Sequence, residues 1–89
     1  MDIIFLGYSL INFTNDDGQH IDGLKFYFAH ESDKSNYSGL QVDSYFVDRQ
    51  NQEVLYSLAQ KCIPLNKYIL DLIPSFNGKT RIKAILQPK

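Results

Sequence analysis

The sequence predicts a small all-β domain with one short helix. Its 89 residues make a single domain, 1–89, large enough to bury a core of its own. A hydrophobic fraction of 44% and an aromatic fraction of 13% exclude a disordered chain. Apolar side chains alternate with polar ones in short runs separated by turn-forming residues, which is typical of β-strands. The spacing becomes helical only once, between residues 51 and 62.

A long first strand is expected at residues 2–13, which are rich in isoleucine, leucine and aromatic side chains. Gly7 within it indicates a bend or a bulge. Residues 15–23 contain asparagine, aspartate and two glycines, Gly18 and Gly23, which readily adopt the left-handed backbone of turns. This segment is expected to connect the first strand to the second.

The next two strands are expected at 24–31 and 40–48. In the first of these, Lys25 and Tyr27 alternate with leucine and phenylalanine side chains, so they are expected to share one face of the strand. In the second, the alternation predicts that Tyr45 lies on the outer face.

A helix and a second hairpin complete the chain. Residues 51–62 place apolar side chains at helical spacing, and Pro64 is expected to end this helix. A fourth strand is expected at 67–76, an Asn-Gly pair predicts a two-residue turn, and a fifth strand is expected at 79–86. Five strands with a helix between the third and fourth is the element order of the OB-fold. We therefore expect a small five-stranded OB-fold-like barrel, with an SH3-like barrel or a small α+β sheet as the alternatives.

Charge is distributed unevenly along the chain. Residues 1–60 carry nine acidic and three basic residues, whereas residues 61–89 carry six basic residues and one acidic residue. Three of the basic residues, Lys79, Arg81 and Lys83, recur at every second position of the predicted last strand. This row indicates a cationic face for a polyanion. The alternative is that the two halves interleave in the fold and their charges only solvate the surface.

The sequence contains no pattern that favours catalysis or a cofactor. His20 and His30 have no cysteine or carboxylate at the ligand spacing of a zinc site. The acidic stretch 15–18 lacks the spacing of a calcium loop, although a weak cation site there stays an alternative to simple turn formation. Cys62 lies on the apolar stripe of the predicted helix and is expected to be a buried, inert thiol. We expect a protein that is not an enzyme and has no cofactor or metal.

The chain is expected to be cytoplasmic. No apolar run approaches the ~18 residues of a membrane span, and the N-terminus has no basic region followed by a cleavage site. The single cysteine agrees with a reducing compartment.

Single-stranded nucleic acid is the ligand that the pattern favours. Such a ligand needs cations along a groove for its phosphates and aromatic rings on which its bases stack. The predicted strands supply both. The candidate residues are Lys25, Tyr27, Tyr45, Phe76, Lys79, Arg81 and Lys83. The alternative for the tyrosines is ordinary cross-strand packing or a dimer interface.

Two segments also match the pattern of a known family. The first, F-T-x3-G-x4-G-x-K-x-Y, runs from Phe13 to Tyr27. The second consists of matches near the C-terminus, at Tyr68, Leu70, Phe76, Arg81, Lys83, Leu86, Pro88 and Lys89. On these residues, which span about half of the chain, the sequence resembles the single-stranded-DNA-binding proteins of filamentous phages, the gene five protein family. The family's pattern differs by one residue between the last glycine and the lysine, and the middle segment 31–62 with its predicted helix does not match.

The resemblance implies an OB-fold homodimer that binds single-stranded DNA without sequence preference. It implies stacking by Tyr27 or Phe26 and by Phe76. It implies phosphate contacts by Lys25, Arg81 and Lys83. One departure concerns the first hairpin, where Asp16 and Ile21 stand at positions that carry arginine in the family. Because aspartate repels phosphate, the last hairpin is expected to carry most of the charge, with modest and salt-sensitive affinity.

Three functional hypotheses follow. The first is a non-enzymatic protein for single-stranded DNA, with RNA as the alternative ligand, from a phage or plasmid replication or transfer system. The second is a protein–protein interaction module whose aromatic residues contact another chain and whose cations form a polar rim. The third is a phage-type inhibitor that occupies a nucleic-acid-binding site of a host protein, which requires the acidic residues to cluster in space.

Overall fold

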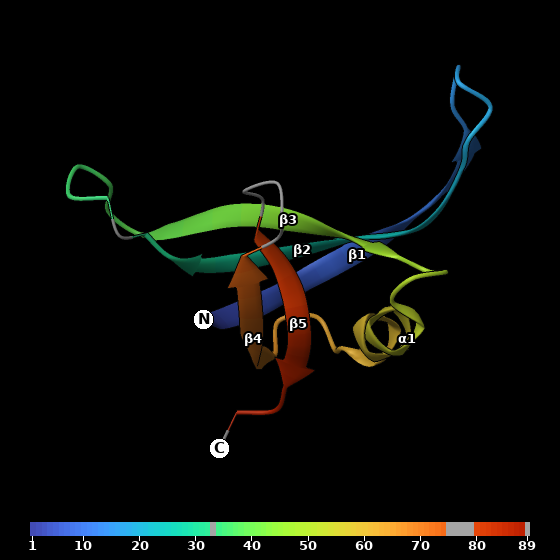
Figure 1. The fold of residues 1–89 in the computed structure, drawn as a ribbon. Coiled ribbons are helices and arrows are strands. Elements are labelled where there is room, and N and C mark those ends of the chain that lie inside the picture. Colours follow the sequence, from blue (N-terminus) through green and yellow to red (C-terminus); the bar gives the residue numbers. More distant parts are fainter. Residues whose placement is uncertain (33, 75–79, 89) are drawn as a thin grey trace.

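The computed structural model describes residues 1–32, 34–74 and 80–88 (Figure 1). It contains five antiparallel strands and one short helix, in the order that the sequence predicts. The elements are β1 (Asp2–Thr14), β2 (His20–Glu31), β3 (Leu40–Asp48), α1 (Glu53–Lys61), β4 (Lys67–Pro74) and β5 (Thr80–Leu86).

The first turn is shorter than the sequence predicts. The Asn15 side-chain oxygen accepts hydrogen bonds from the backbone N–H groups of Asp17 and Gln19, at 3.0 and 2.9 Å. Gly18 supplies the positive φ of 83° that the turn requires. Because this compact turn closes so early, β2 begins at His20 instead of residue 24.

β1 organises the sheet, whose strand order is β3-β2-β1-β4-β5. Almost the whole length of β1 pairs with β2, while its first residues, Asp2 to Ile4, also pair with β4. The register with β2 shifts between Phe5 and Gly7, so the bulge expected at the glycine is confirmed.

The core lies on one face of the three long strands β1, β2 and β3. Figure 1 shows α1 and the β4–β5 hairpin on the same side of these strands. The largest fully buried side chains are Phe5, Phe26, Phe28, Leu24, Leu70 and Val47. The rings of Phe5 and Phe26 stack with centroids 4.8 Å apart. Burial of each such side chain stabilises the fold by about 1.5–3 kcal/mol.

The sheet is open. β3 and β5 stand at the two ends of the strand order, and they contact each other without forming a hydrogen-bonded ladder between their described residues. The prediction of a five-stranded β-rich domain with one helix is therefore confirmed, whereas the closed barrel is not shown.

The β1–β2 hairpin extends beyond the rest of the sheet as a two-stranded arm, residues 11–22 (Figure 1). Pairing between β2 and β3 begins only at Gly23, so none of the described strands flanks the arm. Phe13 on the arm is 51% exposed. Along the described residues, the chain forms no helix with the length and apolarity needed to cross a bilayer.

Candidate nucleic-acid interface

The three long strands expose the face opposite the core, which we call the outer face. Along β2, Leu24, Phe26 and Phe28 point to the core and are fully buried. Side chains alternate along a strand, so Lys25 and Tyr27 lie together on the outer face, as the sequence predicts. Lys25 is exposed and Tyr27 is half-buried.

Tyr45 does not lie on the outer face. It pairs with Phe26 across the β2–β3 ladder, so its side chain is on the core side. Its ring stacks on Phe28, with centroids 5.4 Å apart and planes 16° apart. Burial, with a smaller contribution from the negative charge of Asp43, raises the pKa of the Tyr45 hydroxyl. The prediction of an outward Tyr45 was wrong because the core, supplied by distant strands, takes the face of β3 that carries Tyr45 and Val47.

Phe46 occupies the outer position instead. It lies directly opposite Lys25 in the β2–β3 ladder and is 43% exposed. Its ring crosses over Gly23, because a Cβ at that glycine would lie 2.8 Å from the Phe46 Cζ atom. Sequence reasoning missed Phe46 although one signal was present: a glycine inside a strand often marks a close approach by another group.

Tyr27 is held by two neighbours on the outer face. Its hydroxyl lies 3.4 Å from the Ser9 hydroxyl, where either group can be the donor. The Lys25 ammonium lies 5.9 Å from the centre of the Tyr27 ring, within the range of a cation–π interaction. The face therefore places a cation beside two aromatic rings, Tyr27 and Phe46.

Acidic residues on the outer face of β2 and β3 lie at its ends. Glu31 pairs with Leu40 at one end, and Asp48 pairs with Gly23 at the other. Asp48 is engaged locally, because its carboxylate accepts the Gln50 N–H at 2.8 Å. Lys25 and Phe46 thus lie next to the Asp48 end of this face, and Tyr27 lies between the two acidic ends.

The remaining predicted site residues belong to the last hairpin. Arg81 and Lys83 are exposed on β5, where Ile82 and Ile85 point into the core. β5 is separated from β2 by two strands in the sheet order, so the structure does not bring these cations into one ladder with Lys25. The predicted contacts at Phe76 and Lys79 lie outside the described residues.

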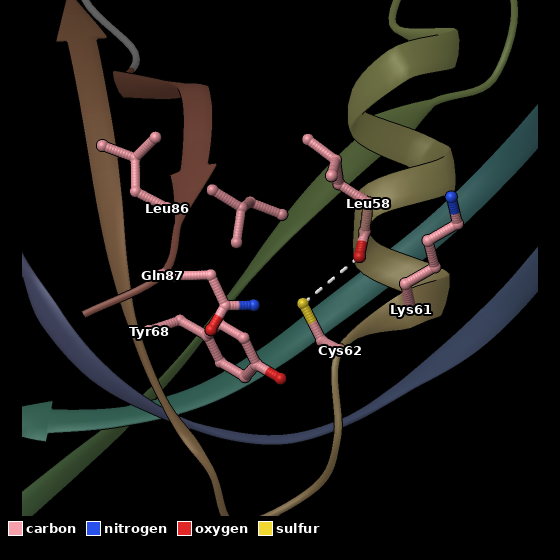
Figure 2. Close-up of a pocket in the computed structure, with 7 residues that line it drawn as sticks. Leu58, Lys61, Cys62, Tyr68, Leu86 and Gln87 are labelled. Carbon is pink, nitrogen blue, oxygen red and sulfur yellow. Dashed lines mark hydrogen bonds between the residues drawn. The ribbon is translucent and has the colours of Figure 1, made fainter. Parts of the chain in front are cut away.

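A small pocket of about 150 Å³ lies between α1 and β5 (Figure 2). Cys62 lines it, half-buried, and its thiol donates a hydrogen bond to the Leu58 carbonyl at 3.3 Å. Burial raises the pKa of the Cys62 thiol, which lowers the fraction of reactive thiolate. The pocket lining is mostly apolar: Leu58, Lys61, Cys62, Tyr68, Ile85, Leu86 and Gln87. These features do not favour a nucleophile.

One polar pair was not predicted from the sequence. The His30 Nε2 atom lies 2.7 Å from the Asp43 carboxylate across the β2–β3 pair. Its partners are thirteen residues apart in the chain, so spacing motifs do not show it. Within residues 1–32, 34–74 and 80–88, no three histidine, cysteine or carboxylate side chains gather in the way a metal ion requires.

Comparisons with known proteins found no counterpart: no family model matches the chain, and searches of curated proteins and of solved structures gave no match. The resemblance to the filamentous-phage proteins therefore stays a prediction.

Proposed function

We propose that this protein is a non-enzymatic, sequence-independent single-stranded DNA-binding protein of the phage or plasmid replication or transfer type. The observation that carries the proposal is the exposed group of Lys25, Tyr27 and Phe46 on the outer face of β2 and β3. In OB-folds the second and third strands supply the face that binds oligonucleotides.

The connectivity supports the same proposal. β1 pairs with both β2 and β4, and α1 connects β3 to β4. β3 and β5 contact each other, and pairing between them would close the sheet into a five-stranded barrel of the OB type. The proposed fold is thus an OB-fold whose last seam is open.

On this surface each residue has a distinct task. Tyr27 and Phe46 stack against bases, and each stacked base contributes about 1–3 kcal/mol to binding. Every base has an aromatic face, so stacking does not select a sequence. Lys25 neutralises a phosphate between the two rings, and Ser9 orients the Tyr27 hydroxyl.

Arg81 and Lys83 supply a second set of phosphate contacts on β5. Asp16 and Asp17 at the tip of the arm repel phosphates, so the bound strand leaves the outer face before it reaches the tip. Few phosphates are neutralised in this arrangement. We therefore expect modest affinity that falls steeply with salt.

The experiment is an anisotropy titration of a fluorescent single strand of about 20 nucleotides, enough to cover one OB-fold. It is run at low and moderate salt, with a duplex of equal length and an RNA strand as competitors. Preference for the single strand and loss of binding with salt support the proposal. Absence of binding at tens of micromolar protein in low salt, or equal competition by the duplex, contradicts it.

A second candidate function is a protein–protein interaction module, which includes an inhibitor of a host protein. It is favoured by the arm, where Phe13 is exposed on a part of the β1–β2 ladder that β3 does not reach. This candidate predicts that substitution of Phe13 abolishes capture of a protein partner while leaving single-strand binding unchanged.

A further inference from the structure

β1 has an open edge over most of its length. On the side away from β2, β4 pairs only with Asp2 to Ile4, and the Phe5 backbone exchanges hydrogen bonds with Leu65 and Asn66. From Leu6 to Thr14, none of the described strands pairs with this side of β1. Figure 1 shows β4 and β5 standing away from the arm into which β1 continues. This stretch of β1 contains no charged residue and no proline, which usually protect an edge from added strands.

The direction of the β1 backbone groups follows from one hydrogen bond. The Arg49 N–H donates to the Asp22 carbonyl at 3.0 Å, so the Asp22 backbone faces β3. Successive residues of an antiparallel strand face opposite sides, so Gly23 faces β1 and its partner Ile11 faces β2. The register has no further shift beyond Gly7, so the direction alternates regularly along the rest of β1. The residues that direct their N–H and C=O to the open edge are Tyr8, Leu10 and Asn12.

The hydrogen bonds of Phe5 agree with this assignment. Phe5 pairs with Phe28, which by the same alternation faces β3, so the Phe5 backbone faces away from β2. On that side its carbonyl accepts the Leu65 N–H at 2.7 Å, and its N–H donates to the Asn66 carbonyl at 3.0 Å. The turn before β4 therefore fills the first place on the edge, which is open from there to the tip of the arm.

The side chains beside this edge are apolar and uncovered. Tyr8 pairs with Phe26, and Leu10 pairs with Leu24, so all four side chains lie on the core side of the sheet. Phe26 and Leu24 are fully buried, whereas Tyr8 is 41% and Leu10 is 62% exposed. The difference arises because β4 does not extend this far along β1. A strand added at the edge would place its own apolar side chains against Tyr8 and Leu10.

Charge at the tip of the arm selects the occupant. The tip carries Asp16 and Asp17, which are both exposed. An added strand that runs antiparallel to β1, as β4 does, begins beside this tip and ends at the turn before β4. Its first residues therefore meet two carboxylates, which favours basic side chains there. The same carboxylates repel phosphate, so a nucleic-acid strand does not fit this edge.

We propose that the open edge of β1 binds an extended segment of a partner protein, which adds as a strand antiparallel to β1. The segment spans about seven residues, with apolar side chains opposite Tyr8 and Leu10 and with basic residues immediately before it for Asp16 and Asp17. Hydrogen bonds to the backbone of Tyr8, Leu10 and Asn12 provide the affinity, and the alternate side chains provide the specificity. The edge uses none of the outer-face residues, so this inference does not rest on the proposed function.

The first test measures the charge preference by anisotropy. The probe is a fluorescent peptide in which two lysines precede seven residues of alternating valine and threonine, and a second peptide carries two glutamates instead of the lysines. The wild-type protein is expected to bind the lysine peptide about tenfold more tightly. The double variant Asp16→Lys, Asp17→Lys is expected to prefer the glutamate peptide. Three results overturn the proposal: equal affinity of the wild type for both peptides, no binding of the lysine peptide at hundreds of micromolar, and an unchanged preference in the double variant.

The second test asks whether the peptide binds as a strand. N-methylation of the lysine peptide at the valines that lie opposite Tyr8 and Leu10 removes the N–H groups that face β1. It is expected to weaken binding at least about tenfold. N-methylation at the threonines opposite Ser9 and Ile11 is the matched control, because those N–H groups face away from β1, and the affinity is expected to be retained. Equal losses for the two methylation patterns overturn the proposal.

The third test locates the edge on this protein. Leu10→Lys places a charge beside the open edge and is expected to weaken binding of the lysine peptide at least about tenfold. Val54→Lys is the matched control, because Val54 is also an exposed apolar residue but lies on α1. Circular dichroism establishes that both variants are folded. Equal affinities of the two variants overturn the proposal.

Two further outcomes separate this inference from its alternatives. Sedimentation of the protein alone tests a second copy of this chain as the occupant: a doubled mass that Leu10→Lys halves overturns the proposal. A protein that binds single-stranded DNA but not the lysine peptide contradicts the inference alone. A protein that binds the peptide but not single-stranded DNA supports the inference and contradicts the proposed function alone.

Discussion

The Phe46 ring lies over Gly23 on the outer face, and the same phenylalanine stands directly opposite Lys25 in the ladder. A side chain at position 23 would meet the Phe46 ring and also the Val47 carbonyl. The Phe46 ring can take this position only because residue 23 of the neighbouring strand has no side chain. The sequences of β2 and β3 therefore both determine where the Phe46 ring lies.

The first prediction concerns that glycine. Gly23→Ala is expected to lower the free energy of unfolding by about 1–3 kcal/mol, because overpacking against backbone cannot be relieved by a rotamer change. Urea denaturation measures the loss. In a Phe46→Ala background the penalty should shrink without vanishing, since the Val47 carbonyl remains. A penalty that is unchanged in this background would show that the ring does not lie over the glycine.

The second prediction concerns stacking. Tyr27→Leu and Phe46→Leu are each expected to weaken single-strand binding by about 1–3 kcal/mol while leaving the slope of affinity against salt unchanged. Tyr8→Leu is the matched control, because Tyr8 is 41% exposed but pairs with Phe26 and so lies on the other side of the sheet. Equal losses of single-strand affinity in Tyr8→Leu and Phe46→Leu would contradict binding at the outer face.

The third prediction concerns phosphate contacts. Lys25→Ala, Arg81→Ala and Lys83→Ala are each expected to reduce the slope of log affinity against log salt by about one phosphate's share. Lys34→Ala, in the loop between β2 and β3, is the control and should not change the slope. The measurement is the anisotropy titration at several salt concentrations. A slope that all four variants share with the wild type would mean that these cations serve another purpose.

The fourth prediction concerns pH. Burial raises the pKa of Tyr45 above its usual value of 10.0, so the unfolded chain loses this proton before the folded chain does. The stability that the neutral hydroxyl contributes is fully present at pH values below the usual pKa of 10.0. It is lost as the pH rises through the higher pKa of the folded protein. Thermal unfolding between pH 9 and 11, about one unit on either side of the usual value, should show a steeper decline for the wild type than for Tyr45→Phe. Identical declines would indicate that Tyr45 is solvated in the folded protein.

Local patterns carried much of the prediction of the fold. The alternation along β2 identified its buried and exposed faces, and Gly7 marked the bulge in β1. The order of the elements along the chain and the position of the helix followed from the change in spacing. Each of these features depends on neighbours within the same segment, so one sequence is enough to recognise them.

The predictions were wrong or incomplete where contacts with distant segments determine which face of a strand is buried. The alternation in β3 separates Tyr45 from Phe46 but does not say which of them meets the core, because the rest of the core is supplied by β1, β2, β4, β5 and α1. The pairing of His30 with Asp43 depends in the same way on the register between two strands. Closure of the barrel depends on how the last hairpin approaches β3, which no local pattern specifies.

The two-stranded arm, residues 11–22, has a consequence for how the molecule opens. Among the described residues, no third strand pairs with the arm and none of its side chains belongs to the core, whereas the ladder at Phe5 and Phe28 is covered by buried rings. Amide protons in the arm should therefore exchange with solvent through local opening at a small fraction of the global free energy, and those beside Phe28 only through global unfolding. The two ends of the β1–β2 ladder therefore differ in their free energy of opening. A partner that covers the arm would be detected first as slowed amide exchange at Phe13 and Ile21.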